Sequence, residues 1–145
     1  VDIEMPFSKY SLAVYYIIMP AEVSTHLSRF DGVRYGLSEP GSSYLDVYKK
    51  TRGIGFGAEA RRRILLGTYV LSHGYLDAYY NKALKVRAKI TEEVENAFKS
   101  VDLIMTPTVP FLPFKIGEKM DDPVSMYLAD IFSATGAEVG DTDPC

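Results

Sequence analysis

Two kinds of charged side chain beside apolar residues are the strongest candidates for chemistry in this sequence of 145 residues. Three arginines fill positions 61–63 and precede Ile64 and Leu65 in a stretch with helical spacing. Because successive residues of a helix point about 100° apart, at least one of these arginines must lie at the apolar boundary. An arginine held there can bind a carboxylate through two parallel hydrogen bonds.

The second candidate is Asp130, an acid within the largely apolar residues 127–132. A carboxylate in apolar surroundings needs a partner that replaces its lost hydration. The residues leave two interpretations open. Each charged group could belong to a structural ion pair or helix cap. Alternatively, an arginine could hold the carboxylate of a substrate while Asp130 holds its amine.

The other reactive residues form no catalytic or metal-binding motif. The sequence has no Gly-x-Ser-x-Gly elbow, and His26 and His73 stand at expected helix ends, where surface or capping roles are typical. Two histidines and Cys145 give no metal-ligand spacing. Backbone amides of the glycine-rich residues 53–57 could hold an anion, but no strand precedes them, so a break before a helix is favoured.

The elements that must position these residues are of two kinds. Residues 12–19 are continuously apolar and rich in β-branched and aromatic types, which predicts a strand buried on both faces and ended by Pro20. Residues 102–108 predict a second short strand, stopped by Pro107. Two strands are too few for a self-sufficient sheet, so we expect both to require neighbours.

Helices account for most of the remaining pattern. The spacing predicts short helices over 21–30 and 45–51, helices over 58–71 and 124–132, and a long amphipathic helix over 76–98 with a solvated charged face. Residues 133–145 contain several glycines and aspartates and predict a loop or frayed end. The combination defines an α/β class.

Composition places the chain among ordinary soluble proteins. Lys and Arg number 16 against 19 Asp and Glu, and 47% of residues are hydrophobic, which excludes a disordered chain or a disulfide-rich scaffold. The longest apolar run, residues 12–20, is too short to span a bilayer. The first residue is Val1 rather than Met, and we expect the chain to be part of a larger protein.

Several runs together resemble one family, the A subunits of the glutamyl-tRNA(Gln)/aspartyl-tRNA(Asn) amidotransferases, which are amidase-signature enzymes. The runs are YYIIMPAE at 15–22, LSRFDGVRYG at 27–36, RRILLGTYVLS at 62–72, DLIMTPT at 102–108 and MYLADIF at 126–132.

The resemblance implies a partial amidase-signature fold, in which helices wrap a mixed sheet and this chain supplies a helix-rich portion with few strands. Residues 1–132 would be the C-terminal portion of that domain, and residues 133–145 a divergent or disordered tail. The family's catalytic Ser-Ser-Lys triad lies in a Gly/Ser-rich segment, and no such segment occurs here. We therefore expect no catalytic residue in this chain.

The resemblance also implies roles for three residues. Arg63 would bind the α-carboxylate of glutamine, Asp130 would meet its α-amine, and Tyr15 would line the pocket. These roles agree with the chemistry argued from the residues, because the two charged ends of an amino acid need one fixed cation and one fixed anion.

The implied function is part of a tRNA-dependent amidotransferase, whose A subunit hydrolyses glutamine and supplies ammonia to convert Glu-tRNA(Gln) to Gln-tRNA(Gln). The expected partners are amidotransferase subunits B and C, glutamine, and misacylated tRNA indirectly through the former, with no membrane and no DNA. No cofactor is expected in this chain, since ATP and Mg²⁺ would be used by its partner. The expected compartment is the cytoplasm or an organellar matrix. The alternatives are a non-catalytic docking piece and an inactive partial gene product.

Overall fold

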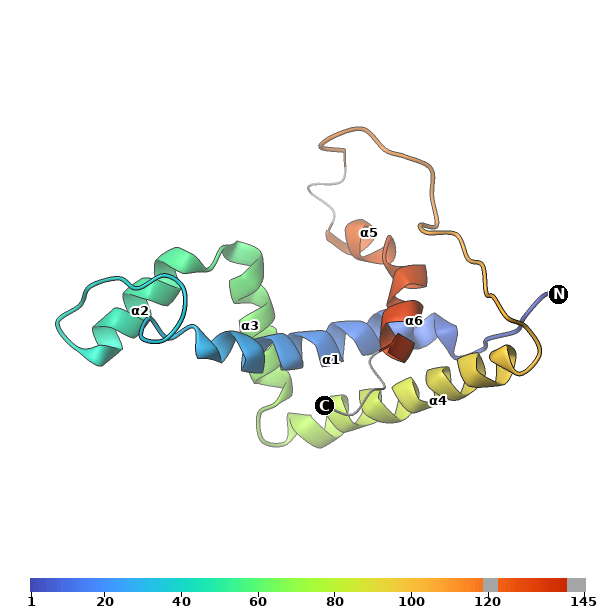
Figure 1. Cartoon of the computed structure of the whole chain (residues 1–145), viewed down its shortest axis with the longest axis horizontal. Helices are drawn as coiled ribbons and strands as arrows, with labels where there is room; N and C mark the ends of the chain where they lie inside the picture. Colours follow the sequence, from blue (N-terminus) through green and yellow to red (C-terminus); the bar gives the residue numbers. More distant parts are fainter. Residues whose placement is uncertain (119–122, 141–145) are drawn as a thin grey trace. The chain divides into compact units, whose positions relative to one another are not determined.

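A computed structural model describes residues 1–118 and 123–140, and every regular element within those ranges is helical (Figure 1). The α-helices are α1 (Ser11–His26), α2 (Tyr44–Gly55), α3 (Ala58–Val70), α4 (Asn81–Phe98), α5 (Pro123–Leu128) and α6 (Ile131–Gly140). Short 3₁₀ turns, η1 (Ser8–Tyr10) and η2 (Leu27–Arg29), flank α1, and a π-helical turn, η3 (Leu76–Tyr80), precedes α4. The helix-rich character is confirmed, whereas the α/β class is not.

The apolar residues 12–19 form part of α1 instead of the predicted strand. An apolar run buried on several sides has the same pattern in a helix and in a central strand, so periodicity could not separate them. A strand must find its hydrogen-bond partners on a neighbour, whereas a helix satisfies them within itself. Pro20 lies inside α1 and removes one intrahelical hydrogen bond without ending the helix.

The second predicted strand is also wrong. Residues 103–107 are extended but belong to no helix or ladder, within the long connection that leaves α4 (Figure 1). Leu103 and Met105 are 72% and 87% exposed. A β-ladder needs a second strand, and the described part of the chain offers none.

The predicted loop over 133–145 is wrong as far as Gly140, because α6 runs through most of it. The Ala134 amide donates to the Asp130 carbonyl at 2.7 Å, and Ala134 is almost fully buried. The Ser11 and Thr135 hydroxyls also hydrogen-bond at 2.8 Å. These contacts hold a glycine-containing helix in place, and residues 141–145 lie outside the described residues.

The chain divides into two compact units, of which the first comprises residues 1–16 and 81–145. In this unit α4 packs against α6, and α4 buries Ala83, Ile90, Val94 and Ala97. Their spacing of three, four and seven residues places them on one helical stripe, which confirms the amphipathic pattern expected of this helix. The N-terminal segment is attached by the Phe7 amide, which donates to the Glu93 carboxylate at 3.1 Å.

The second unit comprises residues 17–80. Here α3 meets α1 through backbone, because a Cβ added at Gly67 would lie only 1.9 Å from the Pro20 carbonyl oxygen. The loop before α2 is held by Thr51, whose hydroxyl accepts from the Glu39 amide at 2.9 Å. Arg52 of α2 donates to the Leu27 carbonyl at 2.7 Å. No helix in the two described stretches is long and apolar enough to cross a membrane.

Candidate functional site

The three consecutive arginines at the start of α3 have three different environments. Arg61 donates to the Phe56 carbonyl at 2.7 Å and to the Gly53 carbonyl, and so caps the C-terminal end of α2. Arg62 points to solvent and pairs with Glu59. The divergence follows from the helical rotation between neighbours, and it singles out the third arginine.

Arg63 is the arginine at the apolar boundary. Its side chain is 30% exposed, against 60% for Arg62. Its Nε lies 2.9 Å from Glu59 Oε1, and its Nη1 lies 3.1 Å from Met19 Sδ on α1. A guanidinium fixed in this way can bind a carboxylate, as its pairing with Glu59 demonstrates.

Asp130 lies in the turn between α5 and α6. Its backbone amide donates to the Tyr127 carbonyl at 3.1 Å, and its carbonyl accepts from Ala134, so backbone contacts fix its position. The side chain is exposed and accepts a hydrogen bond from the Tyr16 hydroxyl at 3.3 Å. The sequence predicted that this acid has a partner, and Tyr16 is one.

Tyr16 connects Asp130 with the third predicted residue. Its ring lies 4.5 Å from the Tyr127 ring and 5.2 Å from the Tyr15 ring, edge to face with the latter. Sequence reasoning chose Tyr15 and missed Tyr16, although the two are adjacent. Tyr15 and Asp130 therefore belong to one aromatic cluster of the first unit, whereas Arg63 belongs to the second unit.

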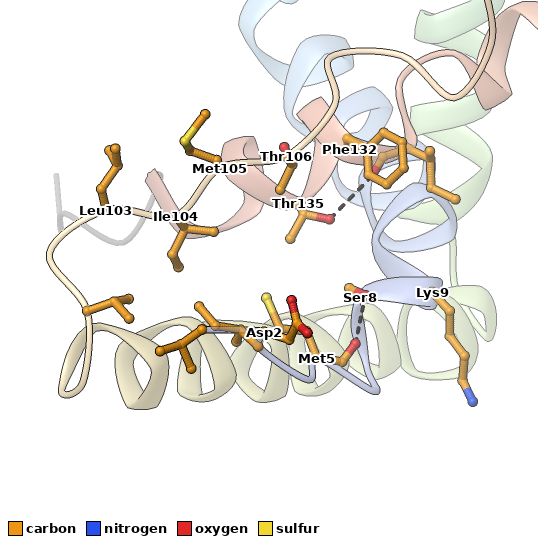
Figure 2. A pocket seen from close by; sticks show the side chains of 14 residues that line it. Asp2, Met5, Ser8, Lys9, Leu103, Ile104, Met105, Thr106, Phe132 and Thr135 are labelled. Atoms are coloured by element: carbon orange, nitrogen blue, oxygen red, sulfur yellow. Dashed lines mark hydrogen bonds between the residues drawn. The ribbon is translucent and has the colours of Figure 1, made fainter.

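The first unit also contains a large apolar groove of about 780 Å³, which we call the 101–106 groove (Figure 2). It is formed by residues of the N-terminal segment, by the extended residues 101–106 and by α6. Its lining includes Met5, Ile104, Met105 and Phe132, and its polar groups include the hydroxyls of Ser8 and Thr135. None of the three predicted site residues lines it.

Electrostatic perturbations within the described residues lie away from these side chains. The Lys50 ammonium and the Ser42 amide hold the pKa of Asp46 below its ordinary value, with Lys50 Nζ 2.9 Å from the carboxylate. A hydrogen bond with Tyr75 raises the pKa of Tyr69 to about 12. Residues 1–118 and 123–140 contain no cluster of His, Cys, Asp or Glu that could hold a metal ion.

Comparison with known proteins identifies the class. The amidase family model matches residues 1–141, so the chain belongs to the amidase family.

The similar proteins within that family share one description. The chain is 57% identical over 140 residues to the A subunit of glutamyl-tRNA(Gln) amidotransferase from Paramagnetospirillum magneticum, in a match that covers 97% of this chain and 29% of the relative. It is also 57% identical over 132 residues to the protein of that name from Parvibaculum lavamentivorans, with 91% and 27% covered. The chain thus spans less than a third of the length of these relatives.

A solved structure agrees with these relatives. The crystal structure of the glutamyl-tRNA(Gln) amidotransferase A subunit from Thermotoga maritima matches with a TM-score of 0.59 and 40% identity, over 95% of this chain and 25% of that one. The helices described here therefore correspond to part of the amidase fold.

Proposed function

We propose that the chain is the C-terminal part of the glutamine-hydrolysing subunit of a tRNA-dependent amidotransferase, and that it supplies glutamine-binding residues without the catalytic ones. The observation that carries the proposal is the 57% identity to the A subunit over 140 residues. The C-terminal position is supported by the motifs at 62–72 and 126–132, together with the lack of a Gly/Ser-rich segment for a Ser-Ser-Lys triad.

In this proposal, the charged ends of glutamine select the residues. Arg63 binds the α-carboxylate in place of Glu59, because its guanidinium already pairs with a carboxylate at 2.9 Å. Asp130 binds the α-ammonium group, and Tyr16 fixes one oxygen of that carboxylate. Tyr15 lines the pocket beside Tyr16.

The partners follow from the same proposal. Ammonia released from glutamine passes to the B subunit, which uses ATP and Mg²⁺ to activate the misacylated tRNA, and the C subunit holds the pair together. The chain itself requires no cofactor, and the reaction takes place in the cytoplasm or an organellar matrix.

Ammonia release tests the proposal directly. The purified chain with glutamine should release none, because the nucleophile and its base are missing. Mixing it with a separately produced N-terminal part of the A subunit, which carries the triad, should restore glutaminase activity. Glutamine hydrolysis by the isolated chain, or a mixture that binds tightly yet stays inactive, would contradict the assignment.

The second candidate is a non-catalytic docking piece, which is favoured by the apolar side chains that the chain exposes. Leu65, Leu103 and Met105 are each more than two-thirds exposed, and such surface is typical of an interface. A pull-down with subunits B and C separates the candidates. Retention of either partner by a chain that never supports glutamine hydrolysis would favour docking alone.

A further inference from the structure

Three tyrosine rings gather where α3 ends and η3 begins, in the second unit. The centroids of the Tyr69 and Tyr75 rings are 4.4 Å apart with an interplanar angle of 37°, and Tyr79 stacks on Tyr75 at 5.9 Å. All three side chains are exposed, by 50%, 39% and 44%. Neither the function of glutamine binding nor the packing of α3 uses them.

A short hydrogen-bonded turn holds the first two rings together. The Ser72 amide donates to the Tyr69 carbonyl at 3.1 Å, and the Tyr75 amide donates to the Ser72 carbonyl at 3.1 Å. Gly74 has a φ of +85°, a conformation that favours glycine and reverses the chain between the two tyrosines. The proximity of the rings is therefore built into the backbone.

Two phenols held at this distance can be joined by oxidation. Loss of one electron and one proton from each ring gives two phenoxyl radicals. Their ortho carbons form one C–C bond, and each ring regains its aromatic form when the ortho hydrogen moves to the oxygen. Two electrons and two protons leave in total. Hydrogen peroxide, used by a peroxidase, accepts both and becomes two molecules of water.

Geometry favours this pair over the other tyrosine pairs in contact. Tyr44 and Tyr48 are 6.4 Å apart, and Tyr75 and Tyr79 are 5.9 Å apart in a nearly parallel stack. Tyr69 and Tyr75 are closer, and a hydrogen bond between the side chains brings the hydroxyls and their ortho carbons together.

We propose that Tyr69 and Tyr75 form an oxidative cross-linking site, at which a peroxidase and hydrogen peroxide produce an intramolecular dityrosine. The bond would join the last turn of α3 to the start of η3 and close the turn around Gly74. The site is independent of glutamine binding and requires no second copy of the chain.

Mass spectrometry of the full chain tests the site. Treatment with peroxidase and limiting hydrogen peroxide should yield a monomer lighter by two hydrogen atoms, with the fluorescence of dityrosine. Residues 64–81 contain no Lys or Arg, so both tyrosines fall in one tryptic peptide. That peptide should carry the mass loss and give no backbone fragments between positions 69 and 75.

Matched variants decide the assignment. Tyr69→Phe and Tyr75→Phe, which keep the ring volume, should each abolish the mass loss in this peptide, and Tyr44→Phe should leave it unchanged. The proposal is overturned if the peptide is unmodified while dityrosine forms elsewhere, if the link joins positions 75 and 79, or if dityrosine in this peptide survives Tyr69→Phe.

Discussion

Arg62 and Arg63 are successive residues of α3 and pair with the same carboxylate, Glu59, yet only Arg63 also contacts Met19. This pair provides a matched test of glutamine binding. In the chain complemented with the N-terminal part of the A subunit, Arg63→Ala should raise the KM for glutamine roughly 10- to 100-fold. A hydrogen bond to a charged group contributes about 1.5–3 kcal/mol, which accounts for that range.

Arg62→Ala is the control, because it removes the same charge from the exposed neighbour and should change the KM by less than about twofold. Steady-state ammonia release over a range of glutamine concentrations measures both variants. Equal effects of the two substitutions would remove Arg63 from the binding site.

Asp46 ties the start of α2 to the preceding loop, and its contacts predict a dependence of stability on pH. The Lys50 ammonium and the Ser42 amide lower the pKa of Asp46 below its ordinary value of 3.8. Its folded pKa is below the unfolded one, so its stabilisation is present above pH 3.8 and is lost as the pH falls through the folded pKa.

Asp46→Asn should therefore lower the melting temperature at neutral pH and converge with the unsubstituted chain in acid. Thermal unfolding followed by circular dichroism from pH 2 to pH 7 measures the difference. In a Lys50→Met background the effect of Asp46→Asn should shrink. A difference between the two chains that stays constant with pH would contradict the role of the ionised carboxylate.

At the scale of elements, the crossing of α1 and α3 depends on one glycine. A Cβ at Gly67 would meet the Pro20 carbonyl oxygen at 1.9 Å and the Ser24 hydroxyl at 2.7 Å, and the first of these atoms is backbone and cannot move aside cheaply. Gly67→Ala should therefore destabilise the chain by roughly 1–3 kcal/mol or more through overpacking.

Gly53→Ala is the matched control, because its new methyl group meets nothing within 4 Å. Within α2 it should stabilise the chain by about 0.5–1 kcal/mol, since alanine loses less conformational entropy than glycine. Urea unfolding of both variants gives the comparison, and similar free energies of unfolding would show that α1 and α3 do not meet at Gly67.

The same elements show which parts of the fold could be predicted from sequence. The stripe of α4 was predictable because its spacing of three and four residues exposes one face to solvent and buries the other. Residues 12–19 were not, because a run that is apolar all round lacks the polar face that reveals a period. The helix over 133–140 depends on packing against α4, which local composition does not report.

The candidate site was predictable to a similar extent. Arg63 and Asp130 could be named because a charge beside apolar residues signals an unusual environment. Tyr16 could not be separated from Tyr15, since the choice depends on how α1 is rotated toward Asp130. With residues 12–19 interpreted as a strand, the two tyrosines would have faced opposite sides.

At the scale of the whole molecule, the chain spans 29% of the length of a relative with which it shares 57% identity. Apolar residues that lie inside the relatives would then be at the surface here. The extended residues 103–107 have backbone groups without a ladder partner, beside the 101–106 groove. Under the proposed function, the remainder of the A subunit covers this region.

Leu103→Lys tests that expectation. Leu103 lines the 101–106 groove and is 72% exposed, so the isolated chain should tolerate the substitution. Association with the N-terminal part of the A subunit should weaken by about tenfold or more, because a charge buried in an apolar contact without a partner costs well over ~1.4 kcal/mol. Isothermal titration calorimetry of the two parts measures the change in Kd.

Leu112→Lys provides the control within the same connection between α4 and α5. Leu112 is 85% exposed but does not line the 101–106 groove, so its substitution introduces the same charge at a similarly exposed leucine. A weaker complex for Leu103→Lys alone locates the contact at the groove. If both variants bind as tightly as the unsubstituted chain, the extended residues contribute nothing to association, and the exposed apolar surface must be covered at another place.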